Sequence, residues 1–254
     1  MEANLKSLRA QGGGDGPEAV TAALAAALNM PWDEKAGKMI VLITDAPPHG
    51  IGEAHDGFDS SPDRMCIRDA FISFPDTYLP PENDPLELAR QMAQDGITLH
   101  MVACEPTLSQ SYTNAVDFYA ALTEITGYGT PHIAISSCLH VPIYRGKMLP
   151  LTMAHKLGDY IAGTAIETVE AEELIKQYQS KIVDNVYGQA KDLDEVVAEM
   201  HKALQEKKVQ MSSVQTENAY VSTSAAMTNK AAWMSSKKVG MAKDKVSKVC
   251  ICVL

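Results

Sequence analysis

The chain has 254 residues, of which 46% are hydrophobic, so it can bury a sizeable core and form one large domain or a domain with an appendage. Its 32 acidic residues outnumber 22 Lys and Arg, and the net charge of -10 argues against general nucleic-acid binding. No stretch approaches the roughly 18 apolar residues that a membrane span needs, no apolar leader opens the chain, and the five cysteines form no CxxC pair; we therefore expect an intracellular, cytoplasmic protein.

Helical and strand-like patterns alternate along most of the chain. The predicted strands are short apolar runs, and the predicted helices show apolar residues at helical spacing, N-caps or closing glycines. In chain order we expect a helix at 18–29, a strand at 39–44, a helix at 86–95, a strand at 97–104, a helix at 115–125, a strand at 131–136, and helices at 149–161 and 171–204. This alternation predicts an α/β fold with a parallel sheet and right-handed crossovers, followed by a helical extension.

The strand predicted at 39–44 carries the first candidate site residue. Its β-branched run predicts a strand buried on both faces, and Asp45 follows directly at its carboxyl end. Ligands bind at this edge of open α/β sheets, which makes Asp45 a candidate binding residue; the alternative is an Asp that only opens a turn. The irregular stretch that follows, 47–85, has a length typical of functional or mobile connections. Asp15 is a candidate N-cap for the helix at 18–29.

The carboxyl-terminal part differs in composition from the rest. Beyond residue 208 the periodicity fades, which predicts a flexible tail, and residues 227–254 hold six lysines against Asp244 alone. The final residues, SKVCICVL, lack a prenylation box because Ile251 occupies the position of the required cysteine. Cys250 and Cys252 beside the lysines are candidate lipidation sites for two-signal membrane attachment, and the alternative is an unmodified tail.

Several other residues have the chemistry of metal ligands or nucleophiles. One loop is dense in possible ligands: His49, Glu53, His55, Asp56, Asp59 and Asp63. Their spacing matches no standard zinc or calcium motif, so we favour a solvated acidic loop, with contact between His49 and a bound ligand as the alternative. Cys66 and Cys104 are candidate nucleophiles, but Cys104 ends a buried strand, which favours a packing role. The chain contains no GxSxG, phosphate-loop or kinase signature, which predicts that it is not an enzyme.

Four segments together resemble the carboxyl-terminal half of a von Willebrand factor type A domain, in the intracellular branch related to alpha-kinases of the VwkA type. They are GGGDGPEAVTAALAAAL (12–28), VLITDAPPHGIGE (41–53), DPLELARQMAQDGITLHMVACEP (84–106) and VDFYAALTEITG (116–127). The resemblance covers about residues 1–175 and implies a Rossmann-like three-layer scaffold.

The resemblance also implies a divalent-cation site at the top of the sheet. Asp15 matches the second metal-binding loop of the family and Asp45 the third, and Mg²⁺ suits such oxygen ligands. The DxSxS loop, which supplies most of the family's ligands, is absent, as are the first strands of the family pattern. We therefore expect a degenerate site, an exposed apolar edge at 39–44, and either a fragment of a longer protein or a loss of its upstream segment.

These observations lead to a functional hypothesis. We expect a partial von Willebrand factor A-like domain at 1–175, a helical extension at 176–208 and a flexible basic tail at 209–254. The expected function is a non-enzymatic protein–protein interaction module in which a cation held by Asp15 and Asp45 engages an acidic residue of a partner. The alternatives are a regulatory fragment of an alpha-kinase-type serine/threonine protein kinase system and a peripheral membrane adaptor that uses the lysine and cysteine tail.

Overall fold

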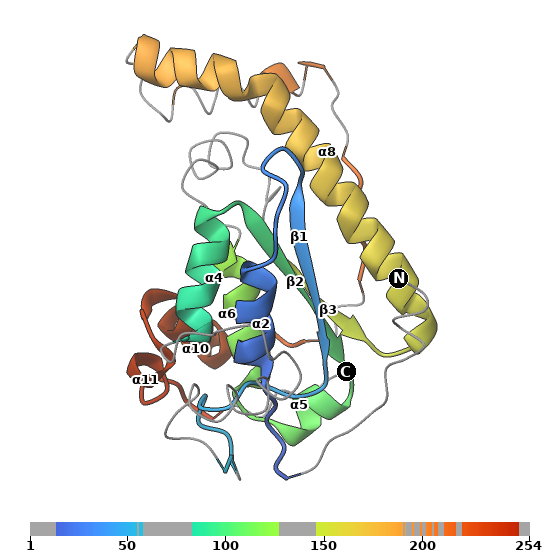
Figure 1. The fold of residues 1–254 in the computed structure, drawn as a ribbon, viewed down its shortest axis with the longest axis vertical. Helices are drawn as coiled ribbons and strands as arrows, with labels where there is room; N and C mark the ends of the chain where they lie inside the picture. Colours follow the sequence, from blue (N-terminus) through green and yellow to red (C-terminus); the bar gives the residue numbers. More distant parts are fainter. Residues whose placement is uncertain are drawn as a thin grey trace.

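A computed structural model gives the fold of the protein (Figure 1). It describes residues 14–54, 56–57, 83–126, 146–189, 191, 195, 199, 202–204, 206–207, 211–216 and 220–248. The helices and strands are α2 (Val20–Leu28), β1 (Lys38–Thr44), α4 (Pro85–Gln94), β2 (Ile97–Cys104), α5 (Thr107–Ser111), α6 (Ala115–Thr126), β3 (Met148–Leu151), η1 (Ala154–Lys156), α8 (Leu157–Val183), η2 (Asp184–Gly188), α10 (Ser224–Ser235) and α11 (Val239–Ala242).

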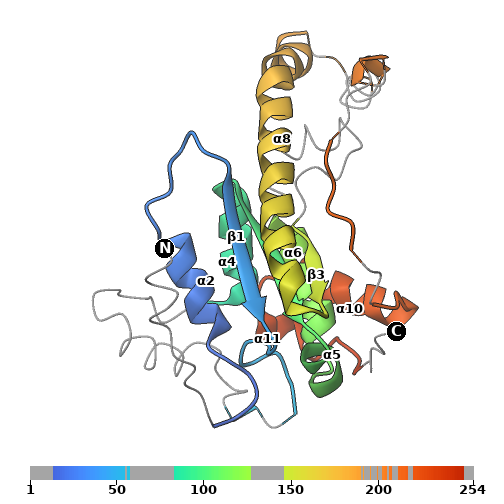
Figure 2. The same cartoon turned by 90° about the vertical axis from the view of Figure 1, so that its right-hand side faces the viewer.

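The described strands form a parallel sheet in the order β1-β2-β3. Lys38 lies opposite Ile97 at the start of the β1–β2 pair, and Met101 lies opposite Met148 in the β2–β3 pair. Helices α2, α4 and α6 cover one face of the sheet, while α8 crosses the other face and extends past its edge (Figures 1 and 2). The predicted α/β class with a parallel sheet and flanking helices is therefore confirmed.

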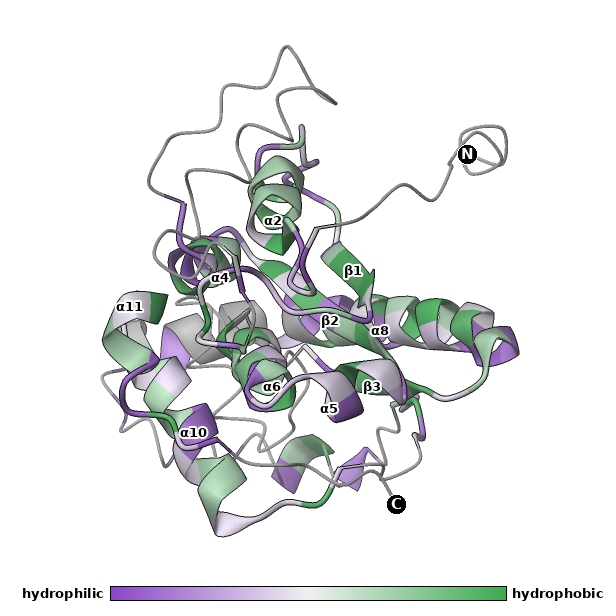
Figure 3. Ribbon diagram, turned by 90° about the horizontal axis from the view of Figure 1, so that it is seen from below, coloured by the Kyte–Doolittle hydropathy of each residue, from purple (hydrophilic) through white to green (hydrophobic). Residues whose placement is uncertain are grey.

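The main core lies between the sheet and the helices α2, α4 and α6. β2 is buried over nearly its whole length: Leu99 and Met101 face these helices, whereas Val102 packs with Leu149 toward α8. Figure 3 colours most of α2 and β1 as hydrophobic, in keeping with elements that pack on a core. Apolar side chains at both faces of β2 explain why this strand forms in the middle of the described sheet.

The strand predicted at 39–44 forms; the expectation that it is buried on both faces is wrong, whereas the expectation of an exposed apolar edge agrees with the described sheet. β1 is only half-buried, and the side chain of Ile43 is 45% exposed. Among the described residues β1 pairs with β2 alone, so it is an edge strand of the described sheet. β2 is instead the strand that both faces of the sheet bury, and its predicted bounds, 97–104, match the structure.

The helix predicted at 86–95 forms for the reasons seen in the sequence. Asp84 accepts a hydrogen bond from the backbone N–H of Leu86, and Pro85 occupies the first turn. Gly96 has a φ of 69°, a left-handed conformation that ends the helix and that glycine adopts at little cost. By contrast, Asp15 does not cap α2, because the N-cap is Ala19 and no side chain accepts a hydrogen bond there.

The helix predicted at 149–161 is wrong at its start. Met148–Leu151 is the parallel strand β3, and α8 begins only at Leu157 after the short turn η1. Pro150 lacks the N–H that a helix interior requires, whereas a strand at the edge of the described sheet tolerates it. α8 then runs to Val183 without a break at residue 175, and the turn η2 that follows it ends at Gly188, within the helix predicted at 171–204. The strand predicted at 131–136 lies outside the described residues.

The prediction of a flexible tail from residue 209 is wrong for residues 220–248. They form α10 and α11, which pack beside α6 and α4 (Figures 1 and 3). Trp233 is fully buried, and its ring meets the ring of Phe118 edge-to-face at 5.3 Å between centroids. The segment 220–248 therefore belongs to the core of the protein, because the ring of Trp233 is buried against Phe118 of α6.

Candidate metal centre

The loop after β1 begins with a tight polar turn that α6 holds in place. The hydroxyl of Thr44 donates to the carbonyl of Ala46 and accepts from the N–H of the same residue. The buried hydroxyl of Tyr119 on α6 also donates to the Ala46 carbonyl, at 2.7 Å. Burial raises the pKa of Tyr119 well above its ordinary value, so this hydroxyl keeps its proton and remains a donor. The chain beyond β1 therefore starts from a fixed point at the carboxyl edge of the sheet.

The glycine-rich segment before α2 lies against this loop. The N–H of Glu18 donates to the carbonyl of Pro47 at 2.9 Å, and Glu18 and Pro48 form an isolated parallel bridge. The hydroxyl of Tyr112 donates to the carbonyl of Gly16 at 2.8 Å. These contacts hold Asp15 beside the post-β1 loop, although more than thirty residues of chain separate it from His49.

Asp15, His49 and Asp56 form a compact cluster at this edge. His49 Nδ1 lies 2.9 Å from Asp56 Oδ1 and 3.6 Å from Asp15 Oδ2. One candidate ligand atom from each residue lies within 4.8 Å of the other two. The side chain of Asp56 is fully buried, and those of His49 and Asp15 are 9% and 19% exposed. The cluster thus joins two carboxylates and one imidazole in a site that is largely removed from solvent.

Backbone N–H groups orient both carboxylates of the cluster. The N–H of Gly50 donates to Asp56 Oδ2 at 2.7 Å, and the N–H of Gly57 donates to Asp15 Oδ2 at 2.8 Å. Gly50 has a φ of 88°, which residues with a side chain rarely adopt, so the turn that brings its N–H to Asp56 depends on glycine. His49 Nδ1 faces the other oxygen of Asp56, Oδ1, at 2.9 Å, and on Asp15 it faces the same Oδ2 that accepts from Gly57, at 3.6 Å.

Glu53 ties the same loop to the beginning of α6. Its buried carboxylate accepts hydrogen bonds from the N–H groups of Thr113, Asn114 and Ala115 and from the Thr113 hydroxyl, at 2.7 to 3.1 Å. Asn114 in turn donates its side-chain amide to the carbonyls of Ile51 and Gly52. A carboxylate in this position satisfies helix N–H groups and meets the positive end of the helix dipole. Glu53 therefore positions the loop rather than the ion.

The spacing of the cluster suits a divalent cation. Ligands about 2.1 Å from an ion lie about 3.0 Å apart in an octahedral site and about 3.4 Å apart in a tetrahedral one. The two distances from His49 Nδ1 to the carboxylate oxygens are close to these values, and an ion would replace the proton that His49 shares with Asp56. Three protein ligands leave further coordination positions for water or for a group from another molecule. The group can therefore hold a metal ion.

Of the two metal ligands predicted from the sequence, Asp15 and Asp45, only Asp15 belongs to the cluster. Asp15 belongs to the cluster, whereas Asp45 is exposed at the end of β1 and is not part of the described cluster. Burial raises the pKa of the Tyr112 hydroxyl, and the negative charges of Asp45, Glu18, Glu53 and Asp15 add to the effect. His49 and Asp56 were visible in the sequence as part of a ligand-dense loop, but the interpretation as a solvated loop missed their burial.

The other sequence candidates do not form a site within the described residues. Burial raises the pKa of the Cys104 thiol, and the charges of Asp45 and Glu105 add to the effect, so the nucleophilic thiolate is disfavoured. His55, Asp59, Asp63, Cys66, Cys250 and Cys252 lie outside the described residues.

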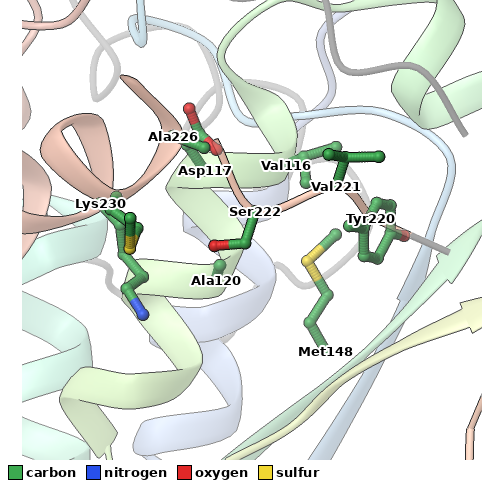
Figure 4. Close-up of a pocket in the computed structure, with 10 residues that line it drawn as sticks. Val116, Asp117, Ala120, Met148, Tyr220, Val221, Ser222, Ala226 and Lys230 are labelled. Carbon is green, nitrogen blue, oxygen red and sulfur yellow. The ribbon is translucent and has the colours of Figure 1, made fainter. Parts of the chain in front are cut away.

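A cavity of about 160 Å³ lies where the segment 220–230 meets α6 and β3 (Figure 4). Its walls are mainly apolar and include Met148 and Val221. The charged groups at its rim already have partners, since Asp117 accepts from Asn229 at 2.9 Å and Lys230 pairs with Glu124. The two charged groups of its lining are therefore already engaged, and its walls offer mainly apolar packing space.

Comparisons of the chain with protein-family models, with curated proteins and with solved structures return no match.

Proposed function

We propose that this protein is a non-enzymatic interaction module that binds a partner protein through a divalent cation held by Asp15, His49 and Asp56. The observation that supports the proposal is the convergence of these three side chains at the carboxyl edge of a parallel sheet. In open α/β sheets this edge is the usual place for a ligand, because the loops that follow the strands meet there.

The donor set indicates which cations to test. Two carboxylates alone suit Mg²⁺, but an imidazole nitrogen adds affinity for Zn²⁺, Mn²⁺ or another first-row ion. Because the three protein groups leave coordination positions open, a carboxylate from a partner can complete the coordination of the ion. Asp45, exposed at the same edge, then lies in the area that such a partner would cover.

The proposal is tested by thermal unfolding of the full chain in chelator and in Mg²⁺, Mn²⁺ or Zn²⁺. An ion that binds only the folded protein adds about 2.7 kcal/mol at 100 times its Kd. For a chain of this size we expect the Tm to rise by about 5 to 10 °C.

Two variants at the same edge separate the possible ligand sets. Asp56→Asn keeps an acceptor for the Gly50 N–H but weakens metal ligation, so it should abolish most of the Tm shift. Asp45→Asn removes an exposed carboxylate outside the cluster and should leave the shift nearly intact. The reverse pattern would identify the pair of Asp15 and Asp45 as the site, and no shift with any of the ions would refute cation binding.

A further inference from the structure

The long helix α8 turns one side to the sheet and the opposite side to solvent. On the inner side Tyr160, Thr164 and Ala171 are buried, and Tyr160 packs with Val102 and Leu149 of the sheet. At about 100° per residue these buried positions lie on one side of the helix. In Figure 2 the opposite side of α8 faces the viewer, and no other described helix covers it.

The outer side of α8 is apolar over its first half. Six small or aliphatic residues follow the spacing i, i+3, i+4, i+7, i+8 and i+11: Gly158, Ile161, Ala162, Ala165, Ile166 and Val169. At about 100° per residue they fall within an arc of about 140°, and we call them the apolar face of α8. Ile161, Ile166 and Val169 are 38%, 50% and 56% exposed, and a Cβ at Gly158 would meet nothing within 4 Å. None of the described helices, α8 among them, is long and apolar enough to cross a membrane. Contiguous exposed apolar surface of this kind indicates an interaction site.

Contacts within the chain mark the two borders of this face. On one flank the side chain of Val214 lies against Gly163. On the other flank the hydroxyl of Thr168 lies 3.7 Å from the sulfur of Met39 on β1. The apolar face lies between these two borders and remains open to another molecule.

The pattern of the face indicates which molecule fits it. The six positions are symmetric about the point between residues 163 and 164, and so they exchange in pairs: Gly158 with Val169, Ile161 with Ile166, and Ala162 with Ala165. A two-fold axis through this point would bring two copies of α8 together antiparallel, with each residue opposite its pair. The alanines at the middle let the two helix axes approach closely, and glycine leaves room for the opposing valine.

Side chains just outside the face follow the same symmetry. His155 precedes the face and is exposed, and Glu172 follows it. The same axis places His155 of one copy opposite Glu172 of the other, so an imidazole N–H can donate to a carboxylate at both ends of the pair. In a parallel pair each of these groups would instead face its own copy. The face is therefore complementary to a second, antiparallel copy of itself.

We infer that this protein forms a two-fold dimer in which the apolar faces of two antiparallel α8 helices pack on each other. The face spans residues 158–169 and is about 18 Å long at about 1.5 Å per residue. A helix pair of this length buries less area than a standard protein–protein interface, so we expect a dissociation constant in the micromolar range. The dimer is separate from cation binding, because the apolar face contains none of the residues of the metal cluster.

The test is analytical ultracentrifugation of the full chain in chelator, at concentrations from about 1 to about 200 μM, which bracket a micromolar dissociation constant. We expect an equilibrium between monomer and dimer. Ile166→Glu should weaken the dimer at least about thirtyfold, because a charge replaces apolar surface on both sides of the axis. Val169→Glu should act in the same direction. Both side chains are exposed in the monomer, so thermal unfolding of the two variants should stay close to that of the parent protein.

A matched control carries the same change on another element. Met241→Glu places a charge on an α11 side chain that is 55% exposed, and it should leave dimerisation unchanged. His155→Glu should weaken the dimer, because it places a second carboxylate opposite Glu172, and the addition of Glu172→Lys should restore it.

Four results would overturn the inference. They are a chain that stays monomeric over the whole range of concentrations, a dimer that Ile166→Glu does not weaken, an equal loss in Met241→Glu, and a failure of Glu172→Lys to restore the dimer of His155→Glu. Association that appears only when Mg²⁺ replaces the chelator would also overturn it, because the contact would then belong to the metal cluster.

Discussion

Replacing Trp233 by alanine tests whether α10 is part of the cooperative fold. The side chain is fully buried, and a tryptophan of this kind buries about 200 Å², equivalent to about 5 kcal/mol of apolar burial. Alanine retains about 1 kcal/mol of that value, and the edge-to-face contact with Phe118 contributes about 1 kcal/mol beyond burial. We therefore expect Trp233→Ala to lower the free energy of unfolding by about 4 to 5 kcal/mol, close to the range for Trp→Ala changes in protein cores.

The variant Trp233→Phe separates burial from hydrogen bonding. The indole Nε1 of Trp233 is buried and has no hydrogen-bond partner among the described residues. Phenylalanine removes this unsatisfied N–H, a gain of about 1 to 3 kcal/mol, while it leaves a smaller cavity than alanine does. The free energy of unfolding should therefore fall by less than about 2 kcal/mol.

Equilibrium urea unfolding followed by far-ultraviolet circular dichroism measures both changes. The segment is docked if Trp233→Ala shifts the single transition of the whole protein to lower urea. A loss below about 1 kcal/mol for Trp233→Ala would refute the reasoning, because it would mean that the ring is not buried against α6 in solution.

Three further predictions concern the sheet and the loop that carries the site. Glu53→Gln replaces a buried carboxylate that accepts four hydrogen bonds and should cost about 2 to 3 kcal/mol in urea unfolding, with loss of the Tm shift by cations as a secondary effect. Gly146→Ala would place a Cβ 1.8 Å from the Leu99 carbonyl oxygen, so it should destabilise the protein by about 1 to 3 kcal/mol or more in the same assay. Burial lowers the pKa of His100 to about 4, so the unfolded state binds the extra proton first and stability should fall by roughly 3 kcal/mol as the pH drops from about 6.5 to about 4. His100→Asn keeps an acceptor for the N–H of Lys147 and should lack this component of the pH dependence; an identical pH profile would contradict it.

The fold class could be predicted because its signals are local. The apolar run of β2 ends at Glu105-Pro106, and α4 begins at an Asp-Pro pair and ends before Gly96, so short windows of sequence contain the whole pattern. β3 was missed because four residues, Met148–Leu151, are too short for a period to show, and Pro150 was the one local clue against a helix.

The docked segment was missed for a different reason. Its helix α10 has apolar and polar residues without a clear apolar face, and its buried residues are Asn229 and Trp233. Docking depends instead on long-range polar contacts, such as that of Arg90 with carbonyls more than 140 residues away. No window of sequence contains such pairs, so a low-periodicity segment rich in Lys, Ser and Thr gave the signature of a flexible tail.

The candidate site shows the same limit. Asp15 was identified, but its pairing with Asp45 came from the resemblance to a von Willebrand factor A domain and from the position of Asp45 at a strand end. The structure places Asp15 instead beside His49 and Asp56. The N–H of Gly57, 42 residues further along the chain, donates to Asp15 Oδ2 and holds it there. Loop closure of this kind is a tertiary property, and glycines such as Gly50 and Gly57 are only a local sign that the loop can turn back tightly.

α6 connects the loop that carries the cation cluster with the docked segment 220–248. Its first turn is capped by Glu53 from the site loop, and its Tyr119 holds the turn at the end of β1. Its Asp117 accepts from Asn229, and its Phe118 packs on Trp233. The post-β1 loop and the docked segment are thus attached to neighbouring positions of one rigid helix. The post-β1 loop and the segment 220–248 therefore keep a fixed relation to each other, because neither can move without breaking buried contacts with α6.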